Sequence, residues 1–419
     1  MSWKIKNYLQ ELRAQEEGAL VFPPGLRHPV AFVYPNVYHL GMSNLGMHIL
    51  YQMINARGDS ACERFFLPER RFIEEHVKSK TPLLSVETGK PLADFAVIFV
   101  MLSFEMDYDN LLTVLDLGNI KLRATERNAR ELAEQARALD ADAIVAIGAG
   151  KLADTAKNVA ELLNVDLVMV PTLACACAAY TPFSVNYDDE HRYVGSPLHG
   201  RNSVAMIVYS ALISRAPAEK MVGGIGDTIA KWYECAPVLE RANDLSAFDQ
   251  LAYQSARLIH DILLEHSEDA LKALRAGDYD NEQVRLLIDT IIGLAGTVGG
   301  LGCERARVSG AHALHNGLTQ VPGSAATMHG DKVAYGVLVQ LVAEGKEAEA
   351  RQLLAYYDSV GLPHSWKQMN IEFTDENLWT VAEYTTQPDS TFLSAVPNAT
   401  PQMLIDAMRV VEEFPAEAA

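Results

Sequence analysis

The chain has 419 residues, of which 49% are hydrophobic and 21% charged, a composition typical of a globular protein with at least one sizeable core. Its formal net charge is −19, from 54 acidic and 35 basic side chains. Such a surface repels nucleic acid and anionic membranes, so we expect neither as a partner.

The first third of the chain alternates short apolar runs with helical patterns. Runs rich in β-branched and aromatic residues predict strands over residues 30–34, 62–67 and 95–102. Between the first two strands, residues 44–56 have a helical period that places Leu45, Ile49, Leu50 and Met53 on one face. This alternation predicts βαβ units and a parallel sheet.

A second βα pattern starts near residue 127. It predicts a helix over 129–139, a strand over 143–147, a helix over 152–163 and a strand over 167–170. The turn Ile147-Gly-Ala-Gly-Lys151 links the first of these strands to its helix. Glycines, a helix N-terminus and a lysine suit a phosphate, although most turns of this kind only join a strand to a helix. The turn is neither a Walker motif nor the full dinucleotide fingerprint.

After Ala216-Pro217 the sequence becomes almost wholly helical, and it contains one carboxylate and two imidazoles that suit a metal ion. Asp227, His312 and His329 lie on separate helical stretches and can hold a divalent cation while leaving coordination positions open. Such a donor set fits Zn²⁺ or Fe²⁺ better than Ca²⁺. Taken singly, each histidine also fits a structural role, and Asp227 also fits a helix N-cap.

These segments resemble, in order and spacing, those of the iron-containing (metal-dependent) alcohol dehydrogenases, in particular the glycerol dehydrogenase-like branch. The resemblance covers about residues 128–414, and it rests on segments 148–157, 171–174, 224–227, 311–317 and 329–336. It implies a Rossmann-like α/β region with a parallel sheet, followed by an all-helical metal-binding domain, in a dehydroquinate synthase-like architecture. NAD(P) and a divalent metal would be the cofactors.

The resemblance also assigns roles to residues at matching positions. Asp227, His312 and His329 would be the metal ligands, and His315, three residues after a ligand, is a candidate proton relay or an outer-shell residue. The cofactor-binding residues would be Gly148, Gly150 and Lys151 at the pyrophosphate, and Thr172, Thr181, Phe183 and Tyr187 at the nicotinamide.

Two departures from the family pattern bear on metal and substrate. Iron-type relatives have a further histidine ligand where this chain has Lys231, which favours a three-ligand site and zinc over iron. Glycerol dehydrogenases have a substrate-contacting aspartate where this chain has Cys177, and the surrounding run looks most like hydroxycarboxylate dehydrogenases. An anionic 2-oxo acid would be repelled by that aspartate but tolerated by a thiol.

The opening of the chain resembles a different family. Segments 22–30, 34–46 and 103–108 look like the cobalamin-binding-type leading domain of certain radical SAM proteins. The cluster of three closely spaced cysteines and the Asp-x-His-x-x-Gly signature are both missing, so we assign no radical or cobalamin chemistry. We expect a junction near residues 123–128, with an α/β domain over 1–122, a nucleotide-binding segment over 123–215 and a helical domain over 216–419.

We therefore expect an NAD(P)-dependent, metal-assisted dehydrogenase that interconverts small 2-oxo and 2-hydroxy acids. The alternatives are a glycerol or polyol dehydrogenase on the same scaffold, and a non-catalytic fusion whose leading domain binds a cobalamin-like ligand or a partner. Five cysteines, no visible signal peptide and no apolar run long enough for a bilayer favour the cytoplasm. The sequence leaves a homo-oligomer open.

Overall fold

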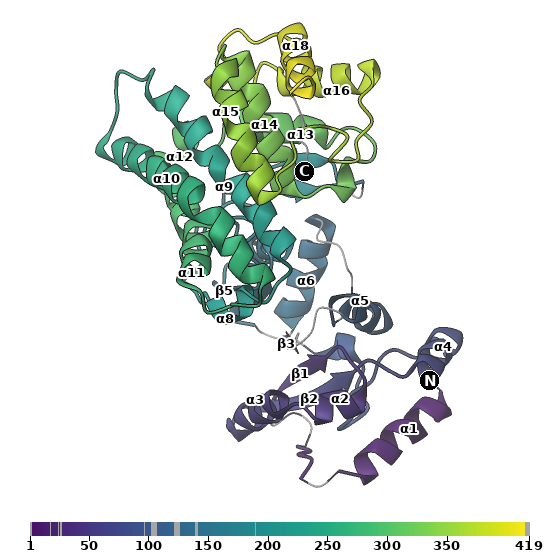
Figure 1. Ribbon diagram of the computed structural model, residues 1–419. Helices are drawn as coiled ribbons and strands as arrows, with labels where there is room; N and C mark the ends of the chain where they lie inside the picture. Colours follow the sequence, from purple (N-terminus) through teal and green to yellow (C-terminus); the bar gives the residue numbers. More distant parts are fainter. Residues whose placement is uncertain are drawn as a thin grey trace. The chain divides into compact units, whose positions relative to one another are not determined.

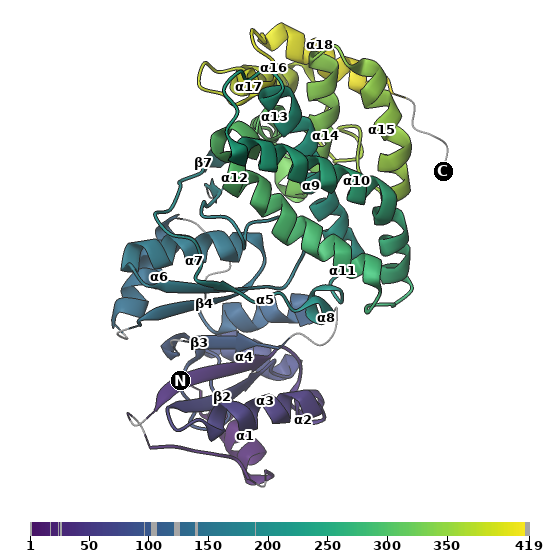
Figure 2. The ribbon, with the colours of Figure 1, turned by 90° about the vertical axis from the view of Figure 1, so that its left-hand side faces the viewer.

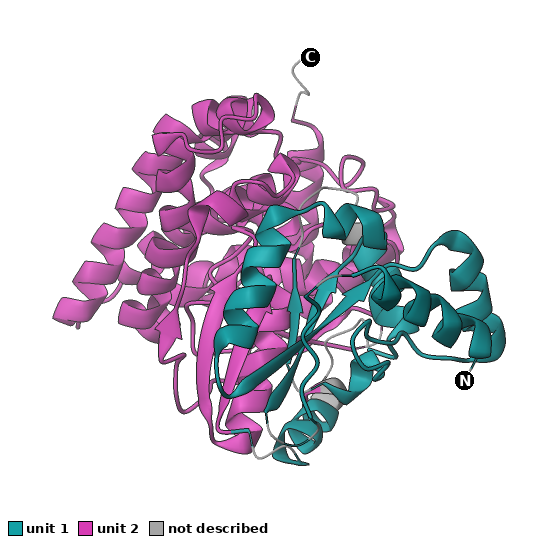
Figure 3. Ribbon diagram, turned by 90° about the horizontal axis from the view of Figure 1, so that it is seen from below, with its two compact units in different colours: residues 1–124, 130–141 teal, residues 125–129, 142–419 magenta. Residues whose placement is uncertain are grey.

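The computed structural model describes residues 2–16, 18–23, 25, 27–95, 97–101, 107–120, 126–138, 141–188 and 190–414 (Figure 1). Its contacts divide the chain into two compact units (Figure 3). Unit 1 consists of residues 1–124 and 130–141, and unit 2 consists of residues 125–129 and 142–419. Residues 103–106 of the segment 103–108 and residues 123–125 of the expected junction at 123–128 lie outside the described residues. The expected division of the dehydrogenase-like part at residue 215 stays a prediction.

Unit 1 is built on a parallel sheet with the strand order β2-β1-β3. Successive side chains of the central strand, β1, point to opposite faces of the sheet. Ala31 and Val33 belong to one apolar cluster, and Phe32 and Tyr34 belong to another. Both faces of the strand are therefore buried, as expected for a parallel sheet covered by helices. The elements are α1 (Trp3–Ala14), β1 (His28–Tyr34), α2 (Tyr38–Met42), α3 (Leu45–Ala56), β2 (Ser60–Phe66), α4 (Arg70–Ser79), η1 (Leu92–Asp94), β3 (Val97–Val100) and α5 (Asp107–Leu117).

A buried ionic cluster lies beside this sheet. The Arg64 guanidinium contacts carboxylate oxygens of Glu16 at 2.5 Å and of Glu87 at 2.6 Å, and all three side chains are almost completely buried. Burial raises the pKa of Glu87, an effect that the neighbouring Arg64 opposes. The positive charge of Arg64 therefore compensates the negative charges of these two buried carboxylates.

The predicted strands of unit 1 are confirmed, and so is the helix over residues 44–56, which the structure places at Leu45–Ala56. The apolar stripe of this helix faces outward, however. Leu45, Ile49 and Met53 are 72%, 50% and 62% exposed, whereas Met47 and Tyr51 are buried.

Unit 2 begins with a second parallel sheet, in the order β4-β5-β8, and α7 packs against β4 and β5 (Figure 2). Helix α6 (Glu126–Ala138) precedes it and is shared between the two units. The sheet and its surroundings comprise β4 (Ala143–Gly148), α7 (Gly150–Leu163), β5 (Asp166–Pro171), β6 (Asn186–Tyr187), β7 (Tyr193–Gly195), β8 (Ala205–Met206) and α8 (Ser210–Ile213). The predicted succession of helix, strand, helix and strand is confirmed.

From residue 218 on, the described chain is helical, as the sequence predicted. Helix α9 packs against α10, α12 and α14. The helices are α9 (Ala218–Leu239), α10 (Ala247–Arg275), α11 (Glu282–Asp289), η2 (Thr290–Leu294), α12 (Ala295–Arg307), α13 (Gly310–Leu318), η3 (Ser324–Ala326), α14 (His329–Ala343), α15 (Glu347–Val360), α16 (Asp375–Thr385), α17 (Phe392–Ala395) and α18 (Pro401–Glu412).

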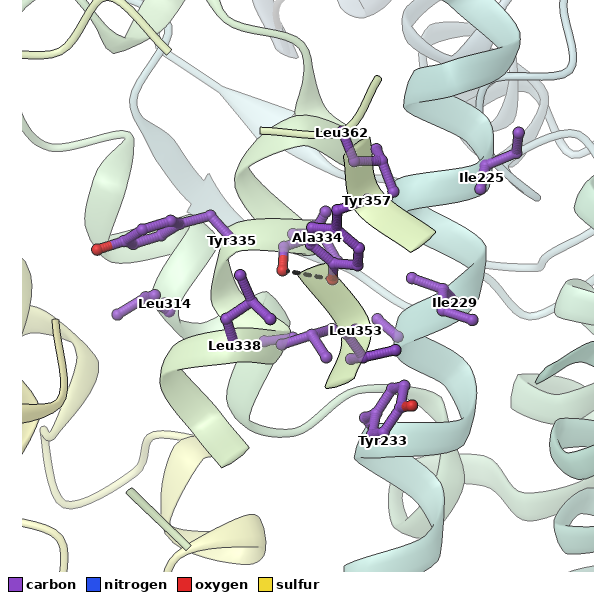
Figure 4. Close-up of a cluster of buried hydrophobic side chains, with 14 of the residues drawn as sticks. Ile225, Ile229, Tyr233, Leu314, Ala334, Tyr335, Leu338, Leu353, Tyr357 and Leu362 are labelled. Carbon is purple, nitrogen blue, oxygen red and sulfur yellow. Dashed lines mark hydrogen bonds between the residues drawn. The ribbon is translucent and has the colours of Figure 1, made fainter. Parts of the chain in front are cut away.

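One large apolar core holds these helices together (Figure 4). Ile225 and Ile229 of α9, Leu338 of α14 and Leu353 of α15 belong to this core, and all four are buried. The Tyr357 hydroxyl donates a hydrogen bond of 2.9 Å to the Ala334 carbonyl oxygen, so its polar end is satisfied inside the core. The core fixes α9 against α14.

Among the described residues, one helical stretch, Glu282–Arg307, is long and apolar enough to cross a membrane by length and composition alone. Its most apolar window is 56% buried, and core helices of globular proteins pass the same test. This stretch is weak support for a membrane segment.

Candidate metal and nucleotide site

Three side chains from three helices converge in unit 2. Asp227 lies on α9, His312 on α13 and His329 at the start of α14. One oxygen of Asp227 is 3.1 Å from Nε2 of His312 and 3.2 Å from Nε2 of His329, and the three potential ligand atoms lie within 4.8 Å of one another. We call these residues the Asp-His-His cluster. Asp227 is in the interior of α9, so the alternative that it caps a helix is wrong.

The spacing of these atoms suits a small divalent cation. An ion with tetrahedral bonds of about 2.0–2.1 Å to its ligands separates the ligand atoms by about 3.3 Å. The two measured contacts, 3.1 and 3.2 Å, are close to this value. One carboxylate and two imidazoles also provide only three ligands, which leaves a position open for a substrate oxygen.

The electrostatics of the Asp-His-His cluster favour a charged carboxylate. Asp227 is completely enclosed, and burial alone would raise its pKa. Hydrogen bonds from His312 and His329, together with the charge of Lys231, outweigh burial and hold the pKa of Asp227 well below its usual range. Burial lowers the pKa of His329, which favours the neutral imidazole that a metal requires as a ligand.

Close approach of the helices requires glycine at two positions. A Cβ atom on Gly330, next to His329, would lie 1.7 Å from the Gly223 carbonyl oxygen. A Cβ atom on Gly224 would lie 2.1 Å from the Ala174 carbonyl oxygen. Backbone occupies the space of a side chain at both positions, so α9 can contact both α14 and the segment that follows β5.

Glu234 positions His312 and was not among the predicted site residues. One of its carboxylate oxygens is 2.7 Å from His312 Nδ1, and the other accepts hydrogen bonds from the backbone N–H groups of His312 and Ser309 at 2.9 and 2.8 Å. The Nδ1–H of His312 therefore donates to Glu234, and Nε2 is directed at Asp227. Glu234 follows Asp227 by seven residues, two turns of one helix, and this spacing was the signal that could have identified it.

His315 supports the other imidazole. Its Nε2 lies 2.9 Å from His329 Nδ1, and its own Nδ1 lies 3.0 Å from the side-chain oxygen of Asn316. Burial and the nearby His329 hold the pKa of His315 well below its usual value, so it stays neutral. A neutral His315 that donates to Asn316 can accept the Nδ1–H of His329, so that a cation would replace the present contact of His329 Nε2 with Asp227.

The glycine turn lies where the carboxyl ends of two parallel strands meet. Gly148 ends β4, Gly150 begins α7 and Lys151 is exposed in the first helical turn. The Thr172 N–H, just after β5, donates to the Gly148 carbonyl oxygen at 3.1 Å. Helix N-termini at this edge of a parallel sheet commonly bind phosphate groups, so these residues fit a dinucleotide pyrophosphate.

Of the residues expected at the nicotinamide, Thr172, Thr181 and Phe183 lie between β5 and β6, and Tyr187 is the last residue of β6. Thr181 is buried and its hydroxyl lies 3.4 Å from the Ala178 carbonyl oxygen, whereas Phe183 is partly buried beneath the Arg307 guanidinium. Burial and the charges of Asp154 and Asp227 raise the pKa of Tyr187.

Cys177 lies near the Asp-His-His cluster. Its thiol is buried, and burial raises its pKa despite the opposing charge of Lys231. A buried neutral thiol brings no negative charge to the site.

A parallel α/β region with a glycine turn, followed by helices that carry one carboxylate and two imidazoles, defines the fold class of the metal-dependent dehydrogenases. Hydroxycarboxylate dehydrogenase A of Escherichia coli K12 is 35% identical to this chain over 282 residues, which are 66% of this chain and 76% of that protein. A glycerol dehydrogenase of Pseudomonas putida is 34% identical over 65% of this chain and 74% of its own length.

Structural comparison shows the same fold. The crystal structure of a probable glycerol dehydrogenase from Sinorhizobium meliloti 1021 matches with a TM-score of 0.66 at 23% identity, over 99% of this chain and 95% of that one. The chain belongs to the iron-containing alcohol dehydrogenase family, in its glycerol dehydrogenase-like branch. It is a dehydrogenase that acts on CH–OH groups, as the sequence predicted.

Residues 46–169 match the family model of radical SAM proteins, N-terminal. The match confirms the resemblance seen in the opening segments. It starts inside α3 and ends inside β5, so it covers parts of both units.

Proposed function

We propose that this enzyme interconverts small 2-oxo acids and 2-hydroxy acids, with Asp227, His312 and His329 holding the metal and the glycine turn holding the dinucleotide. A bound divalent cation would polarise the carbonyl oxygen of the substrate, and NAD(P) would supply or accept the hydride. The three-ligand cluster supports zinc, because Lys231 stands where iron-type relatives have a fourth protein ligand. The low cysteine content, five in 419 residues, supports a cytoplasmic location.

One observation carries the choice of substrate. At the position where glycerol dehydrogenases have a polyol-contacting aspartate, this chain has the uncharged thiol of Cys177, and the charge of Lys231 acts on that thiol. Lys231 is only 4% exposed, so its charge is weakly screened by solvent. A site that lacks this carboxylate and has a buried lysine nearby favours an anionic substrate over a neutral polyol. The similarity to a hydroxycarboxylate dehydrogenase supports the same choice.

The protein's own residues would keep the ligands in the required protonation states. Glu234 fixes the tautomer of His312, and His315 accepts from His329, so both imidazoles present Nε2 to the ion. Because His315 is only 1% exposed, its geometry supports this positioning role better than direct proton transfer to solvent.

The test is a substrate panel on the purified, metal-analysed holoenzyme. We expect turnover of 2-oxo acids such as 2-oxoglutarate with NADH or NADPH to exceed the turnover of dihydroxyacetone. The double variant Asp227→Asn/His312→Ala should lose bound metal and activity together. Its matched control, Asp269→Asn/His266→Ala, changes the same residue types on α10 and should keep both. Undiminished activity of the first variant would reject the metal assignment.

A polyol dehydrogenase is the second candidate, because several similar proteins are glycerol dehydrogenases. Turnover of glycerol and dihydroxyacetone without turnover of any 2-oxo acid would establish it. A cobalamin-like ligand of unit 1 would give an ultraviolet difference spectrum on adding cobalamin, and we expect none.

A further inference from the structure

Lys231, beside the Asp-His-His cluster, and Arg307, whose backbone it contacts, have no role in holding the metal or the dinucleotide. Lys231 lies one helical turn after Asp227 on α9, and its ammonium group donates a hydrogen bond of 3.2 Å to the Arg307 carbonyl oxygen. Arg307 is the last residue of α12. Burial and the charge of Arg307 lower the pKa of Lys231, whereas the nearby Asp227 and Glu234 raise it.

The Arg307 side chain is held in place but is not neutralised. Its guanidinium carbon lies 4.6 Å from the centre of the Phe183 ring. Its Nε is buried, and among the residues that the structure describes this nitrogen has no hydrogen-bond partner and Arg307 forms no ion pair. Buried donors in proteins are almost always satisfied, and a planar guanidinium matches the two oxygens of a carboxylate.

The backbone of α12 leaves space for the Arg307 side chain. A Cβ atom on Gly299 would lie 3.3 Å from Arg307 Cγ and 3.7 Å from its Nε, so the glycine leaves space for the side chain. Helix α12 is also interrupted at Cys303, whose φ of 47° is in the left-handed region that non-glycine residues seldom adopt. Such strain persists where the surrounding structure requires it.

We propose that Arg307 is the residue that binds the substrate carboxylate, and that Lys231 adds positive potential beside it. The proposal rests on the proposed function, since it names the group that recognises the acid. Phe183 is expected at the nicotinamide, so a carboxylate on Arg307 would lie on the same side of the site as the carbon that accepts hydride. The acid group would satisfy the unpaired guanidinium and separate the two like charges.

The experiment compares charged and neutral substrates in three variants. Arg307→Gln removes the positive charge. Arg307→Lys retains the charge but lacks the planar guanidinium group, and Arg305→Gln is the matched control. Arg305 is exposed on the same helix and pairs with Asp244. For Arg307→Gln we expect kcat/KM for 2-oxoglutarate to fall about 10- to 100-fold, the usual effect of losing a charge-assisted hydrogen bond. The value for glycolaldehyde, which has no carboxylate, should change less than about threefold.

Arg307→Lys should recover part of the loss, and Arg305→Gln should behave as wild type on both substrates. Equal losses on both substrates, or an unchanged ratio between them, would overturn the proposal. Binding provides a readout independent of turnover: calorimetry with N-oxalylglycine, a non-reducible analogue of 2-oxoglutarate, should show the same weakening. Metal content and Tm, measured alongside, should stay at wild-type values.

The experiment distinguishes failure of the proposed 2-oxo acid function from failure of the assignment of Arg307. A wild-type enzyme that reduces glycolaldehyde but no 2-oxo acid, and that does not bind N-oxalylglycine, would overturn both statements. A wild-type enzyme that reduces 2-oxo acids with Arg307→Gln unimpaired would overturn only the assignment of Arg307.

Discussion

Replacing Glu234 by glutamine tests whether a residue outside the Asp-His-His cluster controls the affinity of the site for metal. The carboxylate of Glu234 accepts three hydrogen bonds, from His312 Nδ1, the His312 backbone and the Ser309 backbone, at 2.7 to 2.9 Å. An amide at this position keeps the volume but removes the charge, and its NH₂ group cannot accept. At least one of the three donors then loses its acceptor.

The expected loss follows from the role of such residues in metal sites. Removing the partner that orients a ligating histidine typically lowers metal affinity about 10- to 100-fold. This factor corresponds to about 1.4 to 2.8 kcal/mol of binding free energy. The negative charge of Glu234 also raises the pKa of His312 against the effect of burial, so the variant has a less basic imidazole and a weaker ligand.

The assay is a chelator competition that measures the Kd for Zn²⁺ in wild type and in Glu234→Gln. The control Glu219→Gln changes the same residue type in the first turn of the same helix, at an exposed position. We expect the control to bind as wild type does. A Kd for Glu234→Gln within twofold of wild type, with the fold intact by circular dichroism, would refute the argument that Glu234 positions His312.

Three further predictions follow from other parts of the molecule. Gly330→Ala places a Cβ atom 1.7 Å from the Gly223 carbonyl oxygen, so we expect about 3 kcal/mol or more of destabilisation in urea unfolding; an unchanged midpoint would contradict the close helix contact. Arg64→Met leaves the carboxylates of Glu16 and Glu87 unpaired, at a cost of about 3–5 kcal/mol. Because burial raises the pKa of Glu87 in the folded state, this cost should be smaller at pH 5 than at pH 8, and equal losses would be inconsistent with an ionised glutamate. Dialysis against EDTA should abolish turnover and Zn²⁺ should restore it, whereas persistent activity in fully metal-free protein would contradict metal dependence.

The architecture could be predicted because its signals are local. Alternating apolar runs marked the strands of both parallel sheets, and a sustained 3.6-residue period marked the helical region. The orientation of α3 could not be predicted in this way. Its period identifies Leu45, Ile49 and Met53 as one face, but only the tertiary structure shows that this face is exposed.

The candidate site could be predicted in part for the same reason. Asp227, His312 and His329 occur in recognisable local motifs, and the structure brings them together. Glu234 lacked a motif of its own, although its spacing from Asp227 placed it on the same helix. Arg307 could not be predicted, because its position depends on the break in α12 at Cys303, a residue with no evident turn propensity, and on contacts with Phe183 more than a hundred residues away.

The hydrogen bonds of Glu234 have a consequence for how the enzyme acquires its ion. They join the start of α13 to α9 without any metal, so His312 already points its Nε2 at Asp227. Such a preorganised pocket needs little further ordering when a cation enters. Selection among first-row divalent metals then depends on ligand type, geometry and metal availability more than on raw affinity. The metal carried by the enzyme in a cell would then depend on which ion is available during folding.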